Sequence, residues 1–191
     1  TCLRLMHVPG TSAEQLGTLQ AFQLQLTERL RSAQQVQQRE QFYLACAMGT
    51  RRWLFELGHT DQILAGEIPT PVPFTRPWFL GLVNHRGQLI NVIDLDGFAG
   101  AAPRPWQRED RLLVLSSDLP LRCALRVTYS ASVIDRTHLR PATPSATEAD
   151  HRPSWLLHRF IAADGTDYLS VDLVALMALP AFLDIAQPDI H

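Results

Sequence analysis

The sequence predicts a mainly β domain with a few short helices, and two observations lead to this prediction. From residue 41 onward, about eight to ten short apolar runs alternate with turns rich in glycine, proline and aspartate. One arrangement also occurs twice: the strand, turn, strand and short helix expected over residues 79–99 recur over residues 156–178, with Asp94-Leu95 matched by Asp172-Leu173. Such a repeat predicts a duplicated or pseudo-symmetric β-barrel architecture.

Residues 11–40 precede the β region and have a helical pattern. Thr11 or Ser12 can act as the N-cap of this helix. Apolar side chains recur at helical spacing opposite a glutamine-rich face and form one stripe: Leu16, Leu19, Phe22, Leu26 and Leu30. We expect the stripe to pack on the chain's own domain, on a partner protein or on a second copy. The expected division is an N-terminal helical extension (1–40), a β domain (41–180) and a C-terminal tail (181–191).

The first half of the β region combines two strand pairs with short connections. Turn residues separate the apolar runs of each pair, and prolines make the segment between the pairs extended. The elements expected here are strands over 42–48 and 53–57, one helical turn over 59–64, an extended segment over 66–73, strands over 79–83 and 88–95, and a short helix over 94–100.

The second half is expected to follow the same plan after a surface loop rich in proline and arginine. Apolar runs again mark the strands, and an almost entirely polar stretch marks a long loop. The elements expected are a loop over 101–110, a strand over 111–115, a turn over 116–120, a strand over 122–133 with 134–139 continuing it or turning, a loop over 141–153, a hairpin of 155–162 and 168–171, and a helix over 172–179 ending at Pro180.

The composition excludes several classes of function. The net charge of -2 gives no strong attraction to nucleic acid or to an anionic membrane surface. All 17 basic residues are arginine, so no lysine is present for Schiff-base chemistry or a P-loop. No apolar run approaches the ~20 residues of a membrane helix, and we expect no direct membrane insertion. An odd number of cysteines without metal-ligand spacing, Cys2, Cys46 and Cys123, is typical of buried thiols in the cytoplasm.

No set of residues predicts catalysis, a metal site or a cofactor. The seven histidines are scattered singly, and no HExxH, CxxC or GxSxG motif occurs. Asp94 and Asp96 resemble a carboxylate pair, but an Asp-Leu at the end of a strand is commonly a helix cap. The basic residues are too dispersed for a nucleic-acid-binding barrel. We therefore expect a binding module that is not an enzyme and has no metal or cofactor.

Arg86 is the least ordinary residue, because it places a charge where two otherwise apolar strands meet. In one interpretation it pairs with Asp94 or another carboxylate and stabilises the turn. In the other, its planar guanidinium on a rigid strand corner recognises a partner. The two interpretations are compatible.

The same strand pair carries a family signature. In order and spacing, the sequence resembles the CheW family, the adaptors that join chemoreceptors to the histidine kinase CheA. The segments that carry the resemblance are Phe79-Leu80-Gly81-Leu82-Val83-Asn84, Arg86-Gly87 and Asp94-Leu95, with Asp61-Gln62-Ile63-Leu64 resembling the short helix before the signature. The resemblance covers residues 41–179. It implies a CheW-like fold: two five-stranded SH3-like β-barrels that share a hydrophobic core, with short helices.

The resemblance also implies a function and a location. It implies a non-catalytic adaptor that couples a methyl-accepting chemoreceptor to a CheA-like histidine kinase, in the cytoplasm and recruited to membrane-bound receptor arrays. The long N-terminal segment and the residues of the signature are closer to the family members that serve type IV pili and twitching motility. A flagellar or other array is the alternative, and a small-molecule-binding β-barrel sensor is a third hypothesis.

The implied binding residues fall into two groups. The cytoplasmic tip of the receptor is expected to contact Arg86, Gly81, Thr60, Asn84 and Gly87. The regulatory domain of the kinase is expected to dock near Gln62 and Leu57. Four residues depart from the family pattern, which more often has Val, Glu, Leu and Pro, and these departures indicate pathway-specific partners: Thr60, Gln62, His85 and Asn91.

Overall fold

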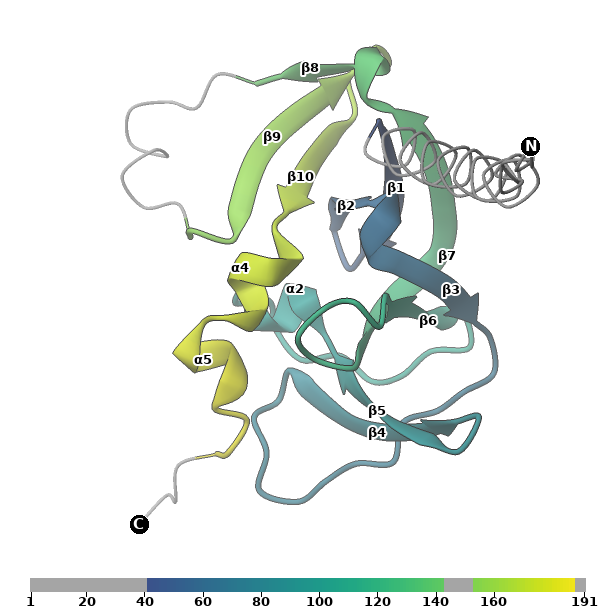
Figure 1. The fold of residues 1–191 in the computed structure, drawn as a ribbon, viewed down its shortest axis with the longest axis vertical. Helices are drawn as coiled ribbons and strands as arrows, with labels where there is room; N and C mark the ends of the chain where they lie inside the picture. The colour runs from purple at the N-terminus through teal and green to yellow at the C-terminus, as the bar shows by residue number, and fades with distance from the viewer. Residues whose placement is uncertain (1–40, 143–152, 188–191) are drawn as a thin grey trace, which may run out of the picture. The chain divides into compact units, whose positions relative to one another are not determined.

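The computed structural model describes residues 41–142 and 153–187, all of which lie within one compact unit. This part of the chain has ten strands and a few short helices, which confirms the predicted mainly β class (Figure 1). The strands are β1 (Phe42–Met48), β2 (Arg51–Glu56), β3 (Thr60–Leu64), β4 (Phe79–His85), β5 (Gln88–Ile93), β6 (Asp110–Leu115), β7 (Cys123–Asp135), β8 (Leu139–Pro141), β9 (Leu156–Ala162) and β10 (Asp167–Val171). The helical segments are η1 (Leu57–His59), α2 (Leu95–Phe98), η2 (Arg136–His138), α4 (Leu173–Met177) and α5 (Pro180–Leu183).

The expected helix of residues 11–40 and most of the expected loop of residues 141–153 lie outside the described residues. The division of the chain into an extension, a domain and a tail stays a prediction.

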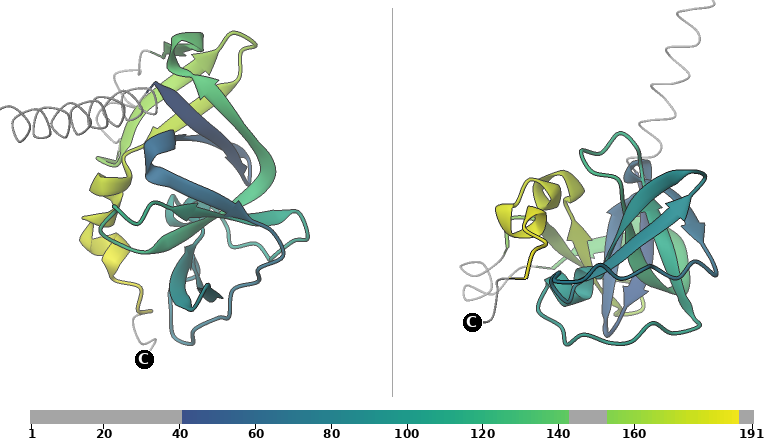
Figure 2. Two further views of the ribbon diagram at one scale, coloured as in Figure 1. Left: turned by 45° about the vertical axis from the view of Figure 1, so that its right-hand side comes forward. Right: turned by 90° about the horizontal axis from the view of Figure 1, so that it is seen from below.

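The long strand β7 connects two groups of strands. Its first residues pair in parallel with β5 and antiparallel with β6, and its later residues pair antiparallel with β1. The ladder runs β3-β6-β7-β1-β2-β10-β9-β8, with β4 attached through β5. In Figures 1 and 2, β4 and β5 lie at one end of this domain and β8, β9 and β10 at the other. The pairing is compatible with two five-stranded barrels, although within the described residues no ladder joins β3 to β4.

The predicted repeat is confirmed and is longer than the sequence indicated. A hairpin, a 3₁₀ turn, a strand, a second hairpin and a short helix follow one another as β1, β2, η1, β3, β4, β5 and α2. The same order then recurs as β6, β7, η2, β8, β9, β10 and α4. Each half supplies strands to the other, since β5 pairs with β7 and β10 pairs with β2.

The prediction of a helical turn over residues 59–64 is wrong for most of that range. The 3₁₀ turn covers Leu57–His59, and Thr60–Leu64 forms the strand β3, which also corrects the expected short helix at Asp61 to Leu64. Half-buried and exposed residues alternate along β3, which is the two-residue period of a strand. A polar-apolar segment this short carries too weak a period to distinguish the two states from sequence.

The chain continues to pack beyond the expected end of the last helix. Helix α4 ends before Pro180, as predicted, but Pro180 then occupies the first turn of a further helix, α5, where its missing N–H costs no hydrogen bond. Phe182 of α5 is buried in the main core. The segment after Pro180 therefore contributes to the core.

Aromatic side chains from both halves meet in this core. Trp78 stacks on Phe182 with ring centroids 5.7 Å apart, and Trp53 stacks on Trp155 at 5.9 Å. Phe98 of α2 contacts Trp155 at 5.8 Å and Phe182 at 5.2 Å. A second apolar cluster lies under the β4–β5 hairpin and gives it a rigid base: Val83, Ile90, Val92, Leu112, Val114 and Ala124.

Candidate functional site

The β4–β5 hairpin ends in a two-residue turn. His85 pairs with Gln88, and Arg86 and Gly87 form the loop between them. Their φ angles are +52° and +78°, so both central residues have the positive φ that a type I′ turn requires. Glycine adopts this conformation freely, whereas a non-glycine residue such as Arg86 is uncommon there. The turn therefore holds Arg86 in a defined and slightly strained position.

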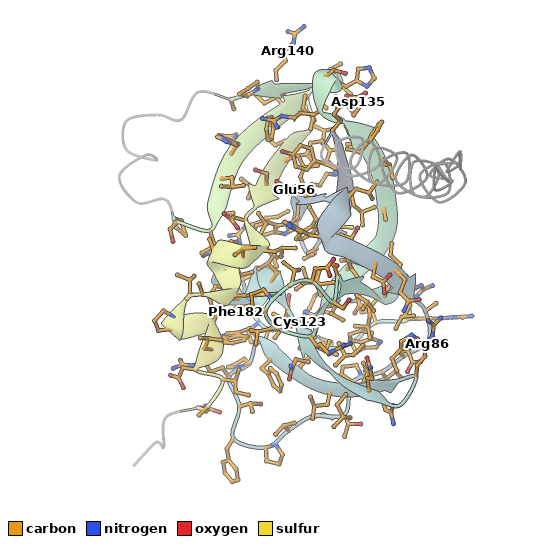
Figure 3. All side chains as sticks on the ribbon, in the orientation of Figure 1. Glu56, Arg86, Cys123, Asp135, Arg140 and Phe182 are labelled. Carbon is orange, nitrogen blue, oxygen red and sulfur yellow. The ribbon has the colours of Figure 1, made fainter. Side chains whose placement is uncertain are left out.

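The Arg86 side chain extends away from the domain into solvent (Figure 3). Among the described residues, no carboxylate forms an ion pair with it. The interpretation in which Arg86 pairs with Asp94 is wrong, because Asp94 pairs with Arg126 instead. We define the hairpin tip as residues 84–88. The Arg86 guanidinium extends from this tip, and no described residue neutralises its charge.

Asp94 has a structural role at the end of β5. One of its oxygens caps α2 by accepting from the Gly97 N–H at 3.3 Å, and the other accepts from Arg126. Asp94 and Arg126 are both buried. Burial lowers the pKa of Arg126, although the Asp94 carboxylate opposes this shift. A buried, paired carboxylate of this kind fixes α2 against β7 and is not available for acid–base chemistry.

A second ion pair extends this buried network. Arg126 donates to the Arg104 carbonyl oxygen at 3.0 Å, and Arg104 holds Asp110 through two hydrogen bonds of 2.9 and 2.7 Å. The expected surface loop of residues 101–110 is therefore attached to the core through Arg104.

Gly81 is buried beneath the segment that precedes β4. Thr70 and Leu82 exchange two backbone hydrogen bonds of 2.8 and 3.0 Å across this point. A Cβ atom on Gly81 would lie 2.0 Å from the Thr70 carbonyl oxygen, and the φ of Gly81 is +122°. Both facts require glycine here. Gly81 shapes the hairpin, and its own atoms are not exposed to a partner.

The structure brings only some of the sequence-predicted site residues together. Gln62, on β3, reaches the hairpin tip, where its side-chain nitrogen donates to Nε2 of His85 at 2.9 Å. Thr60 donates to the Leu57 carbonyl oxygen at 3.0 Å, so these two residues form a separate local unit at the start of β3. Leu57 is half-buried against the main core.

Asn84 and Gly87 are exposed at the hairpin tip, and sequence reasoning missed their neighbour Leu89 and the contact that His85 makes. Leu89, which pairs with Asn84 across the hairpin, is 64% exposed. His85 contacts Gln62, which lies 23 residues earlier in the sequence. Alternation along β5 places Leu89 on the outer face and is a signal that sequence alone provides. No sequence signal connects His85 to Gln62, because the contact joins strands that are not paired.

The remaining chemistry of the described residues does not indicate catalysis. No group of three or more metal-ligating side chains occurs within residues 41–142 and 153–187. Burial raises the pKa of the Cys46 and Cys123 thiols to about 12, which keeps them protonated and unreactive. A groove of about 410 Å³ is lined mainly by polar and charged side chains: Thr50, Arg51, Arg52, Arg159, Asp167 and Leu169. A small-molecule binding pocket is typically lined by apolar side chains instead.

In the part of the chain that the structure describes, no helix has the length and apolar character needed to cross a membrane.

Comparisons with known proteins agree with this fold. The family model of the CheW-like domain matches residues 43–180. Protein PilI of Pseudomonas aeruginosa is 32% identical over 68 residues, which are 36% of this chain and 38% of PilI, so the match spans well under half of that relative. The crystal structure of scaffolding protein TtCheW from Thermoanaerobacter tengcongensis superposes with a TM-score of 0.58 at 18% identity, covering 74% of this chain and 95% of that one.

Proposed function

Since this chain belongs to the CheW-like domain family, we propose that it is a non-catalytic adaptor in a chemosensory array. It couples the cytoplasmic tip of a methyl-accepting chemoreceptor to the regulatory domain of a CheA-like histidine kinase. The likeness to PilI over 68 residues supports the pathway that controls type IV pili and twitching motility. In this role the protein works in the cytoplasm and is recruited to membrane-bound receptors.

The observation that carries this proposal is the exposed guanidinium of Arg86. It extends from a two-residue turn on a hairpin that rests on an apolar cluster. No described carboxylate neutralises it, so it is free to form a charge-assisted bidentate contact with a carboxylate of the receptor. A rigid support makes such contacts more favourable, because little side-chain and loop entropy is lost on binding.

The proposed contact residues differ in how they act. Arg86, Asn84 and Gly87 are exposed at the hairpin tip and meet the receptor directly, and Thr60 contributes from the start of β3. Gly81 acts through shape, since it lets the Thr70 segment lie against β4. Gln62 and Leu57 face the kinase from β3 and η1.

Calorimetric titration with the two partners from the same organism tests the proposal. We expect the protein to bind both the receptor tip and the kinase regulatory domain. Arg86→Glu should weaken receptor binding by roughly tenfold or more, since a charge-assisted contact becomes a repulsive one. Its melting temperature should stay near that of the wild type, because the side chain has no described ion pair to lose.

Arg140→Glu is the matched control. Arg140 is exposed on β8 and extends from the opposite end of the domain in Figure 3, and the substitution changes the net charge equally. It should leave receptor affinity near the wild-type value. Wild-type protein that binds neither partner, or equal losses in the two variants, would contradict the proposal.

A further inference from the structure

The strands β3 and β4 approach each other without a backbone ladder. Within the described residues, β3 pairs only with β6, and β4 pairs only with β5 apart from a single bridge to Thr70. Gln62 of β3 and His85 of β4 bridge this seam through their side chains, with a nitrogen–nitrogen distance of 2.9 Å. Both residues are half-buried. Leu64 of β3 packs on the apolar cluster under the hairpin, and the Gln62–His85 contact adds a direct polar link between β3 and the hairpin tip.

The two side chains are well suited to maintain this contact. An amide has both a donor and an acceptor, and an imidazole has one of each when neutral and two donors when charged. Rotation of the Gln62 amide keeps a hydrogen bond in each state of the ring. One polar group of Gln62 remains available to a partner while the other holds His85.

The Gln62–His85 contact joins residues 23 positions apart, on strands that pair with different neighbours. The two side chains therefore form a single unit of the surface.

We propose that His85 is a specificity and positioning residue, and that Gln62 and His85 act as one unit joining the kinase-facing strand β3 to the receptor-facing hairpin tip. The inference rests on the proposed adaptor function and deepens it. Because the unit presents an uncharged amide, the kinase surface opposite Gln62 should offer a neutral hydrogen-bonding group instead of an Arg or Lys.

The effect on the receptor is indirect. His85 is adjacent to Arg86, whose backbone has a φ of +52° and relies on its surroundings to maintain it. Release of His85 from Gln62 leaves the hairpin tip less constrained. Binding of Arg86 to the receptor then requires more ordering, which lowers affinity without removing a receptor contact.

A double-mutant cycle tests the inference. The wild type, Gln62→Ala, His85→Ala and the double variant are titrated calorimetrically with the kinase regulatory domain and with the receptor tip. We expect each single change to weaken kinase binding roughly threefold to tenfold, the range for one lost hydrogen bond. The double variant should lose no more kinase affinity than the single variant that binds the kinase more weakly, because the pair acts as a unit. His85→Ala should also weaken receptor binding, by a smaller factor.

Two further variants separate positioning from general damage. His85→Gln keeps a donor and an acceptor at the seam and should restore kinase binding to near the wild-type level. Gln88→Ala removes a side chain on the other side of the same turn, where its oxygen accepts from Arg122 and not from β3, and should leave kinase binding unchanged. Melting temperatures of all variants are measured in parallel.

The outcomes distinguish the two proposals. Wild-type protein that binds neither partner overturns the adaptor function, and this inference with it. Wild-type protein that binds both partners overturns only the inference if the two losses add, if His85→Ala has no effect, or if His85→Gln fails to restore binding.

Discussion

The two hairpin–helix units of this domain, β4–β5–α2 and β9–β10–α4, have the same backbone frame and different attachments. In each, an aspartate follows the second strand and donates its N–H to a tryptophan carbonyl oxygen, from Asp94 to Trp78 at 2.8 Å and from Asp172 to Trp155 at 2.9 Å. Each aspartate then caps its helix. Within the described part of the chain, only Asp94 also binds a buried arginine. The shared backbone contacts define the fold, and the side-chain attachments separate the two halves.

The exposed arginines of the two hairpins differ as well: Arg86 lies in the turn of the first hairpin, and Arg159 lies within strand β9 of the second. In the second hairpin, the exposed Arg159 is paired with Asp167 through two hydrogen bonds of 2.9 and 2.7 Å. In the first, Arg86 has no such partner among the described residues. An arginine that is already paired offers less to a binding partner, because the existing ion pair must be broken. The difference supports placing the proposed binding surface on the first hairpin.

Between the two units, the largest difference in the free energy of unfolding is expected when Asp94 and Asp172 are each replaced. Asp94→Ala should lower the free energy of unfolding by about 3–5 kcal/mol, since it leaves the buried Arg126 without its counter-ion. Asp172→Ala removes only a helix cap, and about 1 kcal/mol should be lost. Urea unfolding followed by tryptophan fluorescence measures both. Similar losses in the two variants would mean that the Arg126 pair contributes nothing beyond the cap.

The next contrast concerns the third residue after each of these tryptophans, Gly81 and His158. Gly81→Ala should destabilise the domain by about 3 kcal/mol, because the new methyl group meets the Thr70 backbone and the residue has a positive φ. His158 is exposed, and Phe160 is the one ring among the described residues that it contacts, with centroids 5.8 Å apart, so His158→Ala should cost under about 1 kcal/mol. Nearly equal midpoints would show that the Thr70 segment moves away at little cost.

These contrasts also mark what the sequence predicted. The strands predicted over 79–83 and 88–95 form over 79–85 and 88–93, and the helix at Leu95 and the repeat near Leu173 also form as predicted. These elements were predictable because apolar periodicity and turn residues are local signals. The partner of Asp94 was not predictable, since Arg126 lies 32 residues later on a strand whose neighbours depend on the whole topology. The Gln62–His85 contact was missed for the same reason, whereas β3 was missed because its segment is too short to show a clear period.

The candidate site divides in the same manner. The signature placed Arg86 and Gly87 at a turn, which the hairpin register confirms. Their roles in binding stay predictions. The resemblance grouped Gly81 with the receptor-contact residues, and only the position of the Thr70 segment against β4 shows that Gly81 is buried. Local patterns predicted which residues form the hairpin, but not which of them are available to a partner.

The smallest difference in stability is expected two residues after each aspartate cap, at Asp96 and Val174. Burial raises the pKa of Asp96, although the Arg51 guanidinium, 3.1 Å away, opposes the shift. With a folded pKa above the unfolded value, the folded state binds a proton more readily. The contribution of Asp96 to stability is thus greatest below its unfolded pKa of about 3.9 and is lost as pH rises through the folded pKa.

Relative to Asp96→Asn, which does not titrate, the wild type should therefore gain stability as pH falls from roughly 7 toward 4. Val174 is exposed, so Val174→Asp should add a solvated carboxylate and show no comparable gain. Urea midpoints of the three proteins across this interval measure the effect. If the wild type instead loses stability relative to Asp96→Asn on acidification, the attraction of Arg51 outweighs the effect of burial on the Asp96 pKa. Asp96 would then be a second stabilising ion pair of the first unit, and not a buried carboxylate that destabilises it at neutral pH.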